Sequence, residues 1–156
     1  MKPKSWRWQA TALQIAALVL IATVVSGCSK KTPEDRIREA IAMAQKAAKE
    51  HRPAGVLDII AQGFTDNHGN SRDVIKAILL REMMTNKTLG VYITTENVSV
   101  NGAEATVDLS VVITGSSGWL PEHADRILAR VKMRETDGEW QAYKADWRLA
   151  SGQEPH

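Results

Sequence analysis

Apolar residues follow a helical spacing in the first half of the chain after residue 32. The segment Thr32–Asp35 is typical of a helix start, because threonine caps, proline suits the first turn and carboxylates favour the positive end of the helix dipole. The apolar stripe that follows predicts a first helix that stops near His51, before Pro53. Apolar runs predict a second, shorter helix over Val56–Gly63 and a third over Ser71–Lys87. The expected buried face of the third helix carries Val74, Ile75, Ile78, Leu79 and Met83.

Beyond residue 90 the apolar residues alternate with polar ones, which is typical of half-buried strands. The run Ala105–Ile113 alternates without a break, and Asn101-Gly102 before it is a strong signal for a hairpin turn. The run Val91–Val100 changes parity once, which predicts a bulge near Glu96, and the last strand shifts parity as well. The whole pattern predicts an α+β domain in which three N-terminal helices pack on a curved four-stranded antiparallel sheet.

This order of elements resembles that of a known superfamily. The cues are the Gly63-Phe64 end of the second helix, the Asn101-Gly102 hairpin, and a final strand with Gly138-Glu139-Trp140 and Asp146-Trp147. Over Pro33 to Leu149 the chain resembles the nuclear transport factor 2-like superfamily, which includes SnoaL-like domains and ketosteroid isomerase. The resemblance implies a cone in which a curved, cystatin-like sheet wraps a long helix around a packed or open hollow. Such folds host many activities, so the resemblance bears on fold more than on function.

The beginning of the chain carries a different kind of signal. Basic residues come first, then the apolar run Ala10–Val25, and the run ends in Val25-Ser26-Gly27-Cys28. This ending resembles the lipobox of bacterial lipoproteins, which implies cleavage before Cys28 and a diacylglyceryl group on its thiol. The alternative is an uncleaved anchor, since the uncharged stretch Trp8–Ser29 exceeds the roughly 20 residues needed to span a bilayer.

The lipoprotein interpretation divides the chain into four parts. Residues 1–27 form the signal peptide, 28–32 a lipidated tether, 33–150 the nuclear transport factor 2-like domain and 151–156 a tail. Gram-negative lipoproteins kept in the inner membrane usually have aspartate after the cysteine. The serine at position 29 therefore implies an outer-membrane protein that faces the periplasm. Lys30 and Lys31 either contact anionic lipid or only keep the tether soluble.

Composition narrows the chemistry that we expect. The chain has 20 basic and 18 acidic residues and no basic stripe, so we expect no nucleic-acid partner. Cys28 is the single cysteine, which excludes an internal disulfide. The four histidines have no paired spacing, and we expect no metal and no cofactor. Asp66, His68 and Asn70 fit a turn followed by a helix cap better than a calcium loop.

Enzymes of the superfamily place an acid or base inside the cone, and this chain offers few candidates. If the row Ala105–Ile113 is the inner face, Asp108 lies outside, and Asp146 lies opposite Trp147 by the same reasoning. We therefore assign no catalytic residue. Residues that could line a cavity or meet a partner are Tyr92, Trp119 and Asp146.

Three functional hypotheses follow from the sequence. The first is a membrane-anchored, non-enzymatic module that binds a membrane-proximal protein or a small apolar ligand. The second is an enzyme that uses an inward-facing carboxylate, for which a raised pKa would be the sign. The third is a structural protomer that forms a homodimer through its sheet, for which an apolar outer sheet face would be the sign.

Overall fold

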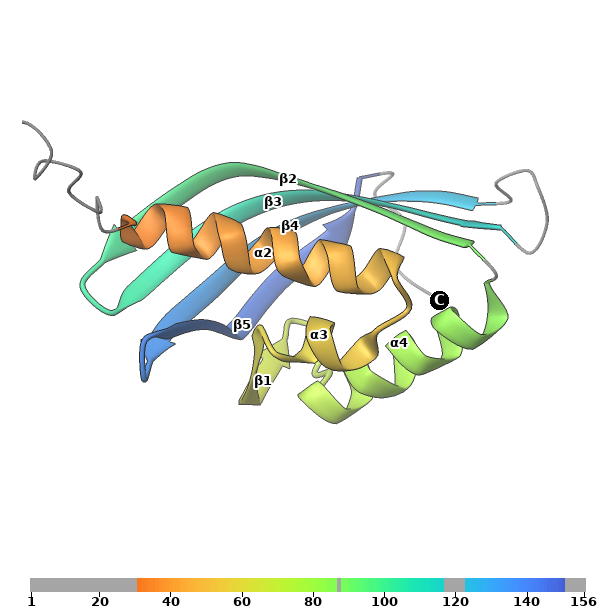
Figure 1. The fold of residues 1–156 in the computed structure, drawn as a ribbon, viewed down its shortest axis with the longest axis horizontal. Coiled ribbons are helices and arrows are strands. Elements are labelled where there is room, and N and C mark those ends of the chain that lie inside the picture. Colours follow the sequence, from red (N-terminus) through yellow and green to blue (C-terminus); the bar gives the residue numbers. More distant parts are fainter. Residues whose placement is uncertain (1–30, 87, 117–122, 151–156) are drawn as a thin grey trace, which may run out of the picture. The chain divides into compact units, whose positions relative to one another are not determined.

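The computed structural model describes residues 31–86, 88–116 and 123–150. Within these ranges the chain forms an α+β domain with a five-stranded sheet of order β1-β5-β4-β3-β2, in which β1 runs parallel to β5 and the other neighbours are antiparallel (Figure 1). The helices are α2 (Pro33–Lys49), α3 (Pro53–Leu57) and α4 (Arg72–Thr85). The strands are β1 (Ile60–Asp66), β2 (Thr88–Asn101), β3 (Glu104–Ser116), β4 (His123–Thr136) and β5 (Glu139–Leu149).

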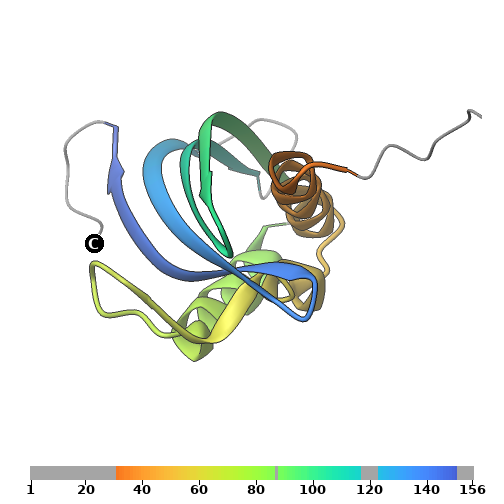
Figure 2. The same ribbon diagram turned by 90° about the vertical axis from the view of Figure 1, so that its left-hand side faces the viewer.

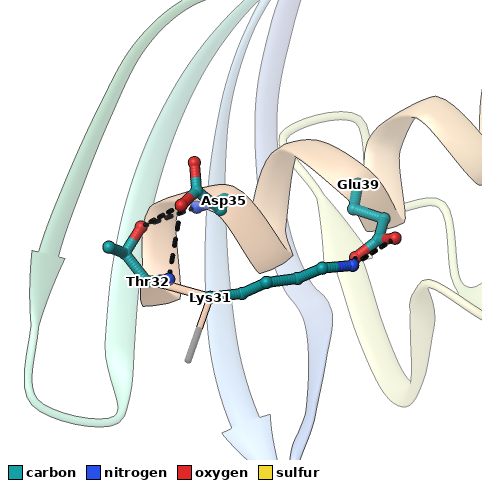
Figure 3. A network of polar contacts seen from close by, with 4 residues as sticks. All are labelled: Lys31, Thr32, Asp35 and Glu39. Atoms are coloured by element: carbon teal, nitrogen blue, oxygen red, sulfur yellow. Dashed lines mark hydrogen bonds and ion pairs between the residues drawn. The ribbon is translucent and has the colours of Figure 1, made fainter. Parts of the chain in front are cut away.

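Helix α2 begins at the predicted Thr32 cap, which forms a capping box with Asp35. The Thr32 hydroxyl accepts a hydrogen bond from the Asp35 backbone N–H at 3.1 Å, and the Asp35 carboxylate accepts one from the Thr32 N–H at 3.3 Å (Figure 3). Lys31 lies beside this cap, and its Nζ is 2.7 Å from a carboxylate oxygen of Glu39 (Figure 3). Both side chains of this ion pair are exposed, so the pair adds little stability.

The prediction of a second helix over Val56–Gly63 is wrong for most of its length. Helix α3 ends at Leu57, and Ile60–Asp66 is a strand at the edge of the sheet. There Ile60 lies opposite Ala142 of β5. A short apolar run fits either a buried helix or a strand, and here the free edge of β5 selects the strand. The sheet therefore has five strands rather than the predicted four.

The bulge and the Asn101-Gly102 turn are confirmed. The β2–β3 register shifts between Thr95 and Asn97, and a second shift leaves Tyr143 of β5 without a partner on β4. Gly102 and Gly138 occupy the turns with φ of +62° and +82°, in the region that favours glycine. The strands bend strongly, and the sheet curves around the helices (Figure 2).

The core lies between α2 and the inner face of the sheet. Its most buried side chains are Ile37 of α2, Val107 of β3 and Met133 of β4. All residues of the main buried cluster lie between Ile37 and Ala145, so the compact unit that begins at Lys31 carries its own core. The predicted buried face of α4 is partly wrong: no α4 residue is fully buried, and two of the five, Val74 and Ile78, are exposed.

Two glycines offer a test of how closely α3 approaches α2. A Cβ on Gly55 would lie 2.7 Å from the Ala47 Cβ, whereas a Cβ on Gly63 would meet nothing within 4 Å. We expect Gly55→Ala to destabilise the domain by about 1–3 kcal/mol, because α3 must move away from α2. The control Gly63→Ala should be neutral or stabilising by up to about 1 kcal/mol. Urea unfolding of both variants measures the difference, and equal stabilities would contradict this packing.

Candidate functional site

A groove of about 720 Å³ lies in the helical layer, between α2, α3, β1 and the start of β5. Buried side chains from three elements form part of its lining: Ala47 of α2, Leu57 of α3 and Trp140 of β5. Trp140 also carries a buried indole N–H that has no hydrogen-bond partner among the described residues. Half of the lining residues are polar or charged, so the groove joins a buried apolar part to a polar rim.

The charged groups of the groove divide into those that hold its walls and those that stay unpaired. The Arg36 guanidinium donates to Glu135 at 2.7 Å and to the Gly138 carbonyl, which ties α2 to the β4–β5 turn. The Arg72 guanidinium donates to the backbone carbonyls of α3 and β1 and holds α4 against them. Within the described part of the chain, the carboxylates of Asp58 and Glu139 have no hydrogen-bond partner. The groove therefore combines buried apolar side chains with charged groups of both signs, since Lys46 and Arg52 also line it.

Asp66 lies at the end of β1, where it pairs with Ala145 of β5, and its carboxylate is buried. It accepts hydrogen bonds from the backbone N–H groups of His68 at 2.9 Å and Asn70 at 2.8 Å. Two side chains, the Asn70 amide and the Trp147 indole, donate to it as well, each at 2.8 Å. The interpretation of residues 66–70 as a turn is confirmed, since the Gly69 N–H also donates to the Asp66 carbonyl.

These contacts decide the protonation state of Asp66. Burial by itself would raise the pKa of the Asp66 carboxyl, but the hydrogen bonds from Trp147, Asn70 and His68 together lower it below its usual value. A carboxylate with a lowered pKa and four donors around it is a poor proton acceptor. Asp66 therefore serves to fix the turn against β5.

The residues singled out from the sequence do not meet in one place. Tyr92 is exposed on the edge strand β2, where Lys49 Nζ lies 4.2 Å from the centre of its ring. Asp146 is exposed on the outer face of β5, in register with Arg130 of β4. Trp147 is half-buried, and its indole bonds to Asp66, so the expected opposition of Trp147 and Asp146 is confirmed. Cys28 and Trp119 lie outside the described residues.

Sequence reasoning missed the groove in the helical layer. Helix α2 lines the groove with Arg36, Glu39 and Met43, a mixture that is typical of a solvent-facing surface. Trp140 gave a signal, since a tryptophan two residues after Gly138 is unusual for an exposed hairpin end. Its partner across the groove could not be found, because the short α3 was read as part of a longer helix.

Two further searches concern the described ranges alone. No group of three or more histidine, cysteine, aspartate or glutamate side chains there is arranged to hold a metal ion. None of the helices in these ranges has the length and apolar character needed to cross a membrane.

The pKa of Asp66 gives a prediction for acid stability. Because the folded-state pKa is lowered, the stabilisation is present above the unfolded-state value near 4 and is lost as pH falls through the folded value. Asp66→Asn should cost about 1.5–3 kcal/mol at pH 7, because hydrogen bonds to a charged acceptor are lost. It should also flatten the loss of stability below about pH 4.

Asp146→Asn is the matched control. Because this carboxylate is exposed, its replacement should leave the loss of stability at acid pH unchanged. Urea unfolding at neutral and acid pH compares the three proteins. If the free energy of unfolding of Asp66→Asn falls as steeply at acid pH as that of the natural chain, Asp66 is not the group responsible.

Comparisons with known proteins place the domain by its shape. No family model matches the chain, and no curated protein matches it. Among solved structures, a nuclear transport factor 2-like protein with a cystatin-like fold from Novosphingobium aromaticivorans aligns with a TM-score of 0.64 at 17% identity, covering 91% of each chain. A domain of unknown function with a cystatin-like fold from Nostoc punctiforme aligns with a TM-score of 0.61 at 17% identity, covering 75% of this chain and 78% of that one.

A protein of Bdellovibrio bacteriovorus aligns with a TM-score of 0.63 at 7% identity. The alignment covers 72% of this chain and only 40% of the Bdellovibrio protein. At such low identities the likeness shows the fold and carries no information on activity. The curved sheet, the helices on its inner side and these likenesses lead to one conclusion: the described domain has the nuclear transport factor 2-like, cystatin-like fold.

Proposed function

We propose that the protein is a lipid-anchored bacterial envelope protein whose cone-shaped domain is a non-enzymatic binding module. The anchor is the lipid on Cys28, and the domain faces the periplasm from the outer membrane. The groove between α2, α3 and β5 takes a small, largely apolar ligand.

The non-enzymatic part of the proposal rests on the hydrogen bonds that already occupy the buried carboxylate. An enzyme of this fold would need an inward-facing acid or base that is free to exchange a proton. In the described ranges the buried carboxylate is Asp66, and four donors already occupy it. Asp108 is paired with Arg130 at 2.7 Å on the outer face. The enzyme alternative therefore lacks its central group in this part of the chain.

The shape and chemistry of the groove support a small ligand. Its volume of about 720 Å³ falls within the roughly 300–1,000 Å³ of ordinary ligand sites. Ala40, Ile59 and Ile60 add apolar surface next to the buried lining, so an apolar ligand would leave water on contact. Lys46 and Arg52 line the groove as well as Asp58 and Glu139, so its charges are of both signs and the apolar surface is what favours the ligand.

The anchor would keep this groove near the membrane. Only Ser29 to Thr32 separate Cys28 from the start of α2, and four extended residues reach at most about 14 Å. A domain held so close to the headgroups would meet apolar molecules that leave or enter the bilayer.

Cys28→Ala tests the anchor. The variant should lose its acyl group and leave the membrane fraction or fail to mature, because the thiol is the acceptor of the lipid. Fractionation and intact-mass analysis check both results, and Ser29→Ala is the control that should stay acylated. A mature N-terminus elsewhere, without acyl mass on Cys28, would contradict the lipoprotein assignment.

Filling the groove tests the ligand site. Ala40→Trp places a large side chain in the groove, and we expect it to weaken binding of the neutral apolar probe N-phenyl-naphthylamine at least about tenfold. Ala103→Trp, in the exposed β2–β3 turn, is the matched control and should bind as the natural chain does. Fluorescence titration measures the affinity, and unchanged binding by Ala40→Trp would exclude this groove.

A further inference from the structure

Helix α4 carries apolar side chains on its outer side as well as on the side that faces the domain. Ile75, Leu79 and Met83 are half-buried toward the domain. On the other side Val74, Ile78 and Leu80 are 42%, 39% and 40% exposed, and Met84 is 86% exposed. Large exposed apolar side chains gathered on one side of a helix are typical of an interaction surface, so the outer side of α4 indicates a missing partner surface.

The charges on this outer side are few and placed at its two ends. Asp73 lies in the first turn, and its carboxylate has no partner within the described part of the chain. Arg81 lies two turns later, 73% exposed, and pairs with its neighbour Glu82 at 3.0 Å. Between them Val74, Ala77 and Ile78 line a shallow groove of about 400 Å³. The face thus carries opposite charges around an apolar centre.

This arrangement is self-complementary about Ala77. Asp73 and Arg81 stand four residues to either side of it, and Val74 and Leu80 stand three residues to either side. In an antiparallel pair of α4 helices with its two-fold axis at Ala77, each Asp73 meets Arg81 of the second copy. Likewise each Val74 meets Leu80 of the second copy. Ala77 lies at the crossing point, where a small side chain lets the helices approach closely.

We propose that the outer side of α4 is the homodimer interface of this protein, formed by an antiparallel, two-fold α4–α4 contact. Two Asp73–Arg81 ion pairs flank an apolar centre made of Val74, Ala77, Ile78 and Leu80. This inference does not depend on the lipid anchor or on a ligand in the groove.

The outer face of the sheet is a weaker candidate for this role. It carries Arg130 paired with Asp108 and Arg134 paired with Glu104. Lys132 and Lys144 face each other directly across β4 and β5, without an acidic partner in the described ranges. Packing such a face against its own copy would bury unpaired like charges, which is unfavourable. The dimer expected through the sheet is therefore replaced by one through α4.

One helix pair buries less than a standard interface, so we expect a weak dimer in solution. Confinement to a membrane would raise its effective concentration.

Charge exchange tests the antiparallel pairing. In the chain from Lys31 onward, studied by sedimentation equilibrium, D73R and R81D should each weaken dimerisation at least about tenfold, because like charges then meet. An equimolar mixture of the two variants should dimerise again, since each contact then joins opposite charges. The double variant D73R/R81D should regain dimerisation by itself. K76E, which changes the charge as much as R81D but lies beside the face, should dimerise like the natural chain.

Three outcomes would overturn the proposal. The natural chain could stay monomeric at millimolar concentration. The mixture of D73R and R81D could stay monomeric while circular dichroism shows both to be folded. Finally, a monomeric chain could bind phosphatidylcholine vesicles and lose that binding in I78K, which would assign the face to the membrane instead.

Discussion

The pairing of β1 with β5 is the constraint on which the rest of the domain depends. It is fixed at one end by side chains, because the Asn67 amide exchanges two hydrogen bonds of 3.0 Å with the Trp147 backbone. Asp66 adds a bond to the Trp147 indole at 2.8 Å. Since β1 lies between α3 and α4 in the chain, this attachment holds both helices beside the sheet. Without it α2 alone would cover the inner face.

This attachment has a chemical consequence as well as a structural one. The buried carboxylate of Asp66 closes the turn, and the hydrogen bonds that it accepts lower its pKa. A carboxylate whose pKa is lowered by hydrogen bonds is unsuited to taking up protons in each cycle of a reaction. The same attachment leaves a gap between α2 and β1, and that gap is the groove that we propose for a ligand.

Exposed charged pairs and exposed apolar side chains lie on different sides of the domain. The outer sheet face carries cross-strand ion pairs such as Arg130–Asp108, which suit a solvated surface. The helical side carries most of the exposed large apolar side chains, on α2 and above all on α4. A protein held at a membrane by its N-terminus and paired through α4 would keep the helical groove and the charged sheet open to other molecules.

The sequence by itself determined the local features of this protein. The helix cap at Thr32, the bulge near Glu96 and the turn at Gly102 depend on neighbouring residues, and all three were predicted. The sequence also predicted that Trp147 faces inward and Asp146 outward, because strand periodicity is a local property. Only the tertiary structure decided whether Ile60–Asp66 became helix or strand, which α4 side chains were covered, and where the groove lay. These features depend on contacts between distant segments, and the free energy of such contacts is not encoded in any one window of sequence.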